Sequence, residues 1–431
     1  MGLRVAPHKT EAVYIHDGSR GAPPVAHIVV EGTRVMVGDQ IKYLGLHIDG
    51  TWSFTEHFTR LAPKVNGVAA ALRRLLPNIG GPGGHTRRLY TATVHAVALY
   101  GAPVLAESAM AVRRNKQLMR QVQRRMAITV ARAYRTVAYE AVLVLAGIPL
   151  FELLARMYAE VYQRIRELRE GGTIIIDRIR VLLRKQARQA LIIKWQRRLY
   201  DESFAGQRVV GAVRPLLSEW LEVQKMRGTF HTTQVLSGHG CFGDYLCRIG
   251  KEETTKCHHC DGDCDSAQHT LQHCPAWTEQ RRVLVHNMGS NDLSLSAIIP
   301  IMVEREEAWR AFASFCGDIM SQKEADERIR RGEQPAEGQP RVRRAGNMGP
   351  PDRRVAVKRT QKATMSQPDD ILAAINELLD DPVFAYDPPL PGSSEQQPPP
   401  TTDRPPTGPA ARPSSRPPKI RTLRSAANQL V

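Results

Sequence analysis

The sequence lacks any long apolar stretch and has little cysteine. Its 431 residues contain no uninterrupted run of the roughly 18 apolar residues that a membrane-spanning helix needs. The first residues, Met-Gly-Leu-Arg-Val-Ala-Pro, lack the apolar core of a signal peptide. Five of the 7 cysteines crowd between Cys247 and Cys274 among histidines, a pattern typical of metal binding in a reducing compartment. We therefore expect a nuclear or cytoplasmic protein that is not secreted and has no membrane partner.

Acidic residues are too few to balance the basic ones. The chain has 60 Lys and Arg against 43 Asp and Glu, which gives a formal net charge of +17. Such an excess favours a polyanionic partner, and nucleic acid is the commonest one. An acidic membrane surface is the alternative, but the metal-binding pattern described next adds nothing to it.

The clustered cysteines and histidines follow metal-ligand spacing. Cys257, Cys260, His269 and Cys274 form a C-x2-C-x8-H-x4-C pattern. Zinc prefers four soft or borderline ligands in a tetrahedron, and a closed site of four protein ligands is structural because no position remains for water. The sequence therefore predicts a structural zinc site. The other residues near enough to compete as ligands are His258, His259, Cys264 and His273.

The remaining patterns predict a mainly α-helical protein with a small N-terminal α+β part. Short apolar runs at 25–30, 34–37 and 41–48, separated by Glu31-Gly32 and Gly38-Asp39, are typical of strands. Apolar residues then recur at helical spacing from Phe54 to about Arg169, and a further basic helical section spans 174–220, with Trp195 and Trp220 as expected core anchors.

Basic residues recur on one face of the helix expected near 110–132. Arg113, Lys116, Arg120 and Arg124 have the spacing of a single helix face, and no Asp or Glu lies between Arg113 and Arg135. A one-sided basic stripe suits a phosphate backbone, although charged runs are commonly just solvated faces. Arg73 and Arg87 are further candidates for nucleic-acid contact. Phe242, Tyr245 and Trp277 are candidate aromatic contacts, although packing over the small metal core explains each of them better.

Several motifs, in this order along the chain, carry a resemblance to a known family. They are Gly2-Leu3, Lys9-Thr10-Glu11, Lys42-Tyr43-Leu44-Gly45, Ala133-Tyr134-Arg135-Thr136, Ala146-Gly147-Ile148-Pro149 and the zinc pattern. Together they cover about residues 1 to 315. They resemble the end of the palm, the thumb and the zinc module of non-LTR retrotransposon reverse transcriptases, most closely those of site-specific insect elements that insert into ribosomal RNA genes.

The resemblance implies roles for some residues and an absence for others. Lys9 would lie near the phosphates of an incoming nucleotide, although an exposed structural lysine is the simpler interpretation, and Tyr43 would belong to the hairpin that grips the primer. The catalytic Asp-Asp turn of the family, which holds two magnesium ions, should precede Gly2, and no Asp-Asp pair occurs before residue 369. We therefore expect a truncated protein that binds RNA, DNA or an RNA–DNA hybrid without polymerising, with Mg²⁺ needed only by the intact polymerase.

The expected organisation has five parts. These are the palm remnant (1–50), a thumb-like helical domain (51–170), a helical connector (171–230), the zinc module with flanking helices (231–315) and a mostly disordered Pro-rich tail (316–431). A short amphipathic helix near 369–382 would interrupt the tail and dock a protein partner. The alternative function is a stand-alone zinc-knuckle adaptor that binds nucleic acid and has no polymerase role.

Overall fold

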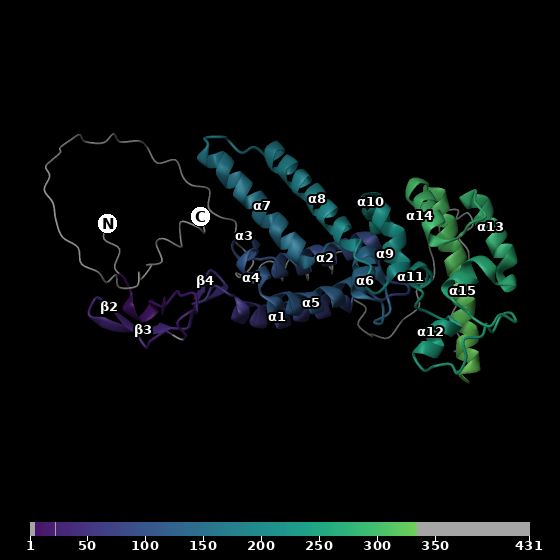
Figure 1. Cartoon of the computed structure of the whole chain (residues 1–431), viewed down its shortest axis with the longest axis horizontal. Helices are drawn as coiled ribbons and strands as arrows, with labels where there is room; N and C mark the ends of the chain where they lie inside the picture. Colours follow the sequence, from purple (N-terminus) through teal and green to yellow (C-terminus); the bar gives the residue numbers. More distant parts are fainter. Residues whose placement is uncertain (1–4, 22, 334–431) are drawn as a thin grey trace, which may run out of the picture. The chain divides into compact units, whose positions relative to one another are not determined.

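The computed structural model describes residues 5–21 and 23–333, which fall into two units divided in sequence between Trp52 and Ser53. The first unit contains short strands, and the second is built from helices (Figure 1). The prediction of a mainly helical protein with a few N-terminal strands is thus confirmed for the described residues. The expected helix near 369–382 and most of the expected tail lie outside them.

The described part of the first unit holds five strands in two small sheets. The strands are β1 (Ala12–Val13), β2 (His27–Val30), β3 (Thr33–Gly38), β4 (Gln40–Tyr43) and β5 (Leu46–Asp49). β3 pairs in parallel with β1 and antiparallel with β2, whereas β4 and β5 form a separate antiparallel hairpin. A short helical turn, η1 (Pro7–Lys9), precedes them.

Two-residue turns set both hairpins. Glu31-Gly32 and Leu44-Gly45 each have two positive φ angles, the turn whose twist matches that of the flanking strands. The apolar run 41–48 is therefore two strands, with Ile41, Leu46 and Ile48 buried on one face. The structure contains a hairpin at Tyr43-Leu44-Gly45, and its assignment to a polymerase palm stays a prediction.

The second unit contains the helices from Thr55 onward. They are α1 (Thr55–Arg73), α2 (Gly84–Ala98), α3 (Ala102–Leu105), α4 (Ser108–Ala111), α5 (Arg113–Ala131), α6 (Tyr139–Ala146), α7 (Phe151–Glu170), α8 (Asp177–Leu199), α9 (Gln207–Val213), α10 (Leu217–Arg227), α11 (Phe230–Ser237), α12 (Gly243–Arg248), α13 (Thr278–Met288), α14 (Leu295–Glu304) and α15 (Glu306–Arg330), with the short turns η2 (Arg214–Leu216), η3 (His269–His273) and η4 (Pro275–Trp277).

The core of this unit forms where α1, α5 and α6 pack together. α5 buries Met119, Val122 and Met126 along one stripe, as an amphipathic helix does. α6 is buried almost all round and ends at Gly147. Gly147 takes a left-handed conformation there, and the amide of Ile148 donates to the carbonyl of Leu143, which closes the helix and starts the turn into α7.

Arg87 is part of this core, which corrects its assignment as a nucleic-acid contact. Its side chain is 2% exposed. The guanidinium donates to the carbonyls of Leu76, Pro77, Pro82 and Thr129, and so joins the end of α1 to α2 and α5. Burial lowers the pKa of Arg87 to about 10, so the group keeps its charge at neutral pH. These four acceptors take four of its five N–H donors, and a side chain this deeply buried is not presented to a phosphate.

We expect Arg87→Ala to destabilise the chain by about 3 kcal/mol or more, because buried carbonyls would lose charge-assisted hydrogen bonds and a cavity would remain. Denaturant unfolding measures this cost. The neighbouring Arg88 is exposed, so Arg88→Ala serves as the matched control and should change stability by less than about 0.5 kcal/mol. Equal effects of the two substitutions would contradict the anchoring role of Arg87.

The long helices α7 and α8 run side by side (Figure 1). An ion pair between Lys194 and Glu160, 2.7 Å long, links their exposed faces. The domain boundary that we expected at 170/171 falls in the turn between these two packed helices. No single helix among the described residues is long and apolar enough to cross a membrane, and α6 and α7 reach that length only together, across a 53° bend.

The last helices gather around α15 (Figure 1). Trp220 and Trp195 are fully buried, which confirms them as core anchors. The indole of Trp220 donates to the carbonyl of Val144 at 3.0 Å and packs on Trp309 of α15 at 5.4 Å between ring centroids. α15 continues to Arg330, past residue 316, where we expected the disordered tail to begin. This expectation was wrong because the helix buries residues beyond that point, among them Ile319 and Met320.

Candidate metal centre and basic helix face

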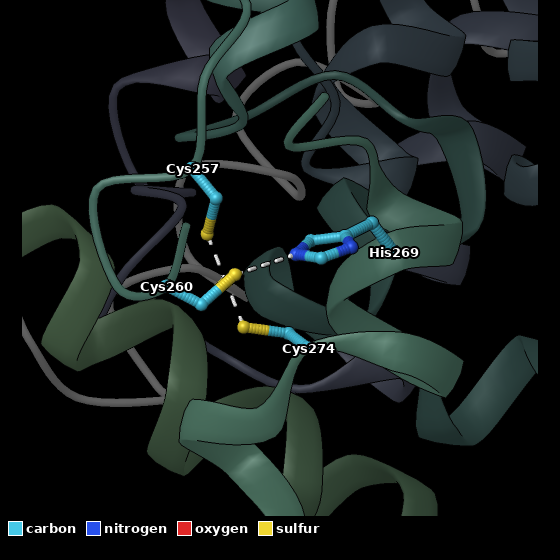
Figure 2. A group of neighbouring side chains, drawn as sticks. All are labelled: Cys257, Cys260, His269 and Cys274. Carbon is cyan, nitrogen blue, oxygen red and sulfur yellow. Dashed lines mark hydrogen bonds between the residues drawn. The ribbon is translucent and has the colours of Figure 1, made fainter. Parts of the chain in front are cut away.

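Four side chains from the loop between α12 and α13 point to a common centre (Figure 2). Cys257 and Cys260 come from a turn after α12, His269 begins η3, and Cys274 follows its end. Their ligand atoms all lie within 4.8 Å of one another. The sulfurs of Cys257 and Cys274 are 3.9 Å apart, and the sulfur of Cys260 is 3.3 Å from Nε2 of His269.

These distances fit a tetrahedral zinc ion. Zinc bonds of about 2.3 Å to sulfur and 2.0 Å to nitrogen place the ligand atoms roughly 3.5 to 3.8 Å from one another. Burial raises the pKa of the Cys274 thiol to about 12, because a buried thiolate is poorly solvated. Thiolates here therefore need a cation beside them, and a dication supplies that charge. The cluster Cys257, Cys260, His269 and Cys274 could hold a zinc ion.

The competing ligand candidates lie elsewhere. His258 faces Glu252 at 3.6 Å, and His259 packs on Trp277 and faces Asp326. Cys264 and His273 are exposed. The residues of the described part of the chain that lie together and could hold a metal ion are thus the set that the spacing predicts.

Glycines let the chain close around this centre. A Cβ on Gly243 would lie 2.7 and 2.8 Å from the carbonyl oxygens of Thr255 and Lys256. Only glycine therefore allows the segment before Cys257 to pass this close to the start of α12. A Cβ on Gly262 would meet the ring of His269 at 3.1 Å and the sulfur of Cys260 at 3.3 Å.

A buried ion pair anchors the loop between α12 and α13 (the metal loop) to α15. Both carboxylate oxygens of Asp265 accept from Nζ of Lys323 at 2.8 Å, and the two side chains are 4% and 2% exposed. Asp265 also accepts from the amide of Gly243 and the hydroxyl of Thr270, the neighbour of His269. Lys323 in turn lies over the ring of Phe242 at 5.4 Å. Asp265 thus ties the start of α12, η3 and α15 together behind the ligands.

Sequence reasoning missed these supporting residues. Lys323 stands at the start of a charged stretch that we assigned to the tail, and only its fold neighbours reveal that it is buried. Arg281 of α13 is a second example, because its guanidinium donates to the carbonyl oxygens of Leu271 and Cys274. In the sequence Arg281 looks like any basic residue on a helix, so nothing there indicates this role.

The predicted aromatic contacts are buried rather than displayed. Phe242, Tyr245 and Trp277 are each no more than 2% exposed. Packing, the alternative that we left open for all three, explains them without a nucleic-acid role.

The basic stripe of α5 divides into free and engaged residues. Arg113 is exposed and Lys116 half-buried at its start. Arg120 donates to Glu152 of α7 at 2.8 Å, and Arg198 of α8 joins the same carboxylate at 3.4 Å. Burial raises the pKa of the neighbouring Glu140, which Arg198 also contacts at 3.5 Å. Arg120 is therefore held in an inter-helix network.

The other predicted contacts differ in exposure. Arg124 donates to the carbonyl of Arg135, so its guanidinium also braces the turn after α5. Arg73 is exposed at the end of α1. In the first unit Lys9 is exposed, and Tyr43 is half-buried at the end of β4. Of the predicted contacts in the helical unit, those with no partner described above are Arg113, Lys116 and Arg73.

Known proteins similar to this chain come from one class of mobile element. The chain is 26% identical over 332 residues to a putative 115 kDa protein in type-1 retrotransposable element R1DM of Drosophila melanogaster, covering 75% of this chain and 32% of that protein. It is 26% identical over 288 residues to a retrovirus-related Pol polyprotein from type-1 retrotransposable element R1 4 of Nasonia vitripennis, covering 65% and 72%. A Pol polyprotein from element R1 of Bradysia coprophila is 27% identical over 293 residues.

The chain thus spans about a third of the length of the Drosophila protein. No protein-family model matches it, and no solved structure does.

Proposed function

We propose that this chain, a relative of the Pol proteins of type-1 R1 retrotransposable elements as its ordered motifs indicated, binds nucleic acid through its helical unit. The observation that carries the proposal is the basic start of α5, where Arg113 is exposed and Lys116 is partly exposed. Arg113 and Lys116 stand on one face of a helix that carries no acidic residue of its own. Each phosphate that such a face neutralises releases a condensed counterion, which drives association.

The partner we propose is the template–primer duplex or the element RNA of target-primed reverse transcription. Within that process the helical unit would hold the duplex while other parts of a Pol protein perform RNA-directed DNA synthesis. Support comes from the net charge of +17 and from the relatives, whose names place them in retrotransposons. The hairpin at Tyr43 would contribute as the primer-gripping element of a palm, with Mg²⁺ required only for synthesis.

We propose that zinc has a structural role here. The cluster offers four protein ligands and no open position for water, so we assign no chemistry to the ion. Its contribution is to fix the four ligands within the loop between α12 and α13, in addition to the ion pair of Asp265 and Lys323 that holds this loop to α15.

The double substitution Arg113→Ala/Lys116→Ala should weaken binding of the full chain to an RNA–DNA hybrid and flatten its salt dependence. Each lost phosphate contact lowers the slope of log Kd against log salt by roughly 0.7 to 0.9. A fluorescence anisotropy titration between about 50 and 200 mM salt measures both effects.

The matched control is Arg282→Ala/Arg310→Ala. It removes the same charge from exposed positions of α13 and α15, where each arginine pairs with a glutamate of its own helix. It should leave the slope unchanged. An equal loss in both variants would mean that net charge alone drives binding and that the α5 face is not the contact.

A further inference from the structure

A cavity of about 410 Å³ in the helical unit has no role so far. It lies where the loop before α6 and the start of α9 meet the turn between α11 and α12, and it is separate from the metal ligands. Its rim carries exposed Thr136, Ala205, Arg248 and Ile249. The volume is within the range of small-ligand sites, roughly 300 to 1,000 Å³.

One end of the cavity is polar and uncharged. The hydroxyl of Thr136 lies 2.7 Å from the hydroxyl of Tyr245 and 2.9 Å from Nδ1 of His239. The rings of His239 and Tyr245 pack at 4.8 Å between centroids, which fixes the imidazole further. Burial, together with nearby Arg248, lowers the pKa of His239 to about 4, so the ring is neutral at pH 7. Because Nδ1 is engaged by Thr136, Nε2 is the ring nitrogen that a ligand in the cavity can use.

The buried part of the lining is apolar. Val137, Ala141 and Val209 are buried and line the cavity, and Ile249 continues the apolar surface at the rim. Such walls exclude a bare phosphate as the main occupant, because an anion would lose its hydration against them. They suit an uncharged flat ring that has polar edges.

A cation stands beside the apolar walls. Arg248 is exposed at the rim, and its guanidinium lies 5.4 Å from the ring centroid of Tyr245. The stacked position leaves the edge of the guanidinium for an acceptor, and arginine matches phosphate geometry well. The cavity therefore combines a slot for a ring with a site for an anion at its mouth.

We propose that this cavity binds one unpaired nucleotide, its base between the apolar walls with its edge toward Thr136 and His239, and its phosphate on Arg248. The chemistry is shared by a nucleotide within a single strand and by a free mononucleotide. Bases splayed out of a strand are bound in this manner by aromatic and polar side chains. The proposal rests on the proposed nucleic-acid binding and adds a preference for an unpaired base.

The test is to fill the mouth of the cavity in the full chain. Ala205→Trp places an indole at the rim, and Ser203→Trp, exposed in the same loop but not lining the cavity, is its matched control. Binding is measured with a 12-nucleotide single-stranded RNA and a 12-base-pair blunt RNA–DNA hybrid duplex. Ala205→Trp should raise the Kd for the single strand about tenfold, the typical effect of losing one base contact, and leave the duplex unchanged.

Each outcome decides a different point. Equal affinity of Ala205→Trp and Ser203→Trp for the single strand overturns the proposal that the cavity binds a nucleotide. Failure of the unaltered chain to bind either probe overturns the proposed function itself. Competition distinguishes the two sources of the nucleotide. If AMP at millimolar concentration displaces the RNA and inorganic phosphate does not, the cavity takes a free mononucleotide as well. If neither displaces it while Ala205→Trp weakens binding, the nucleotide must belong to a strand.

Arg248→Ala gives a second, independent readout. It should weaken binding of the single strand and lower the slope of log Kd against log salt by about 0.7, the value for one phosphate contact on a single strand. Arg282→Ala is again the control of equal charge. An unchanged slope in Arg248→Ala would contradict the proposal that Arg248 binds the phosphate of the nucleotide.

Discussion

Cys274→Ser, or treatment with a strong zinc chelator, should unfold the region between α12 and α13 and lower the thermal midpoint of the helical unit. The purified chain should carry about one zinc ion, and this variant should lose it, because a closed structural site tolerates no missing ligand. Structural zinc contributes about 10 to 16 kcal/mol in small zinc-binding peptides. That exceeds what a loop with few apolar side chains can recover by packing. Elemental analysis of the metal and a melting curve measure the two effects.

Cys264 provides the control for the metal prediction. It lies within the same loop, between Cys260 and His269, but its side chain is exposed and outside the cluster. Cys264→Ser should retain the zinc and the melting temperature of the unaltered chain. Retention of a full equivalent of zinc by Cys274→Ser would contradict the ligand set, and loss of zinc without any change in melting would contradict its structural role.

Asp265→Asn or Lys323→Met alone should cost about 3 to 5 kcal/mol, because each leaves the partner charge buried without compensation. The double variant should cost clearly less than the sum of the two, since it removes both charges together. Denaturant unfolding of the four proteins completes the cycle. Asp265 also accepts hydrogen bonds from Gly243 and Thr270, next to the ligand His269, so we expect Asp265→Asn to retain zinc less tightly.

The surface pair of Glu279 and Arg282 is the control for this cycle. Its side chains are 74% and 77% exposed, and they pair within one helix. Removing either residue should change stability by less than about 1 kcal/mol because water screens the interaction. Additive effects of Asp265→Asn and Lys323→Met would show that the two charges are not coupled, and the anchoring of the metal loop to α15 would then need another cause.

Local patterns sufficed for the helices and for the metal ligands. Helical spacing of apolar residues predicted the helical region from Phe54 to about Arg169 and, within it, α5 to within a few residues, because such a helix buries one stripe of its own sequence. The four ligands of the cluster lie within 18 residues of chain, so their spacing alone brings them together. The order of the motifs also pointed to the retrotransposon relatives.

Tertiary contacts decided which basic residues remain available to a ligand. Arg87 and Arg113 look alike in the sequence, yet Arg87 donates to three carbonyls between α1 and α2 and to one in α5, whereas Arg113 is exposed. Arg120 shares its helix face with Lys116, but Glu152 arrives from α7, 32 residues away, and pairs with it. The spacing of basic residues along one helix contains no information about an acidic partner on another helix.

The sequence by itself predicted the helical class, the four Cys and His residues that lie together and could hold a metal, and the similarity to R1 proteins, since all three depend on residues close together or in fixed order. Only the tertiary structure decided that Lys323 and Asp265 lie behind the metal loop, that the cavity at His239 exists, and that α15 extends to Arg330. The physical reason is the same in each case. Burial of a charge, a cavity or a long polar helix depends on surfaces from segments distant in sequence, and those surfaces meet only when the chain has folded.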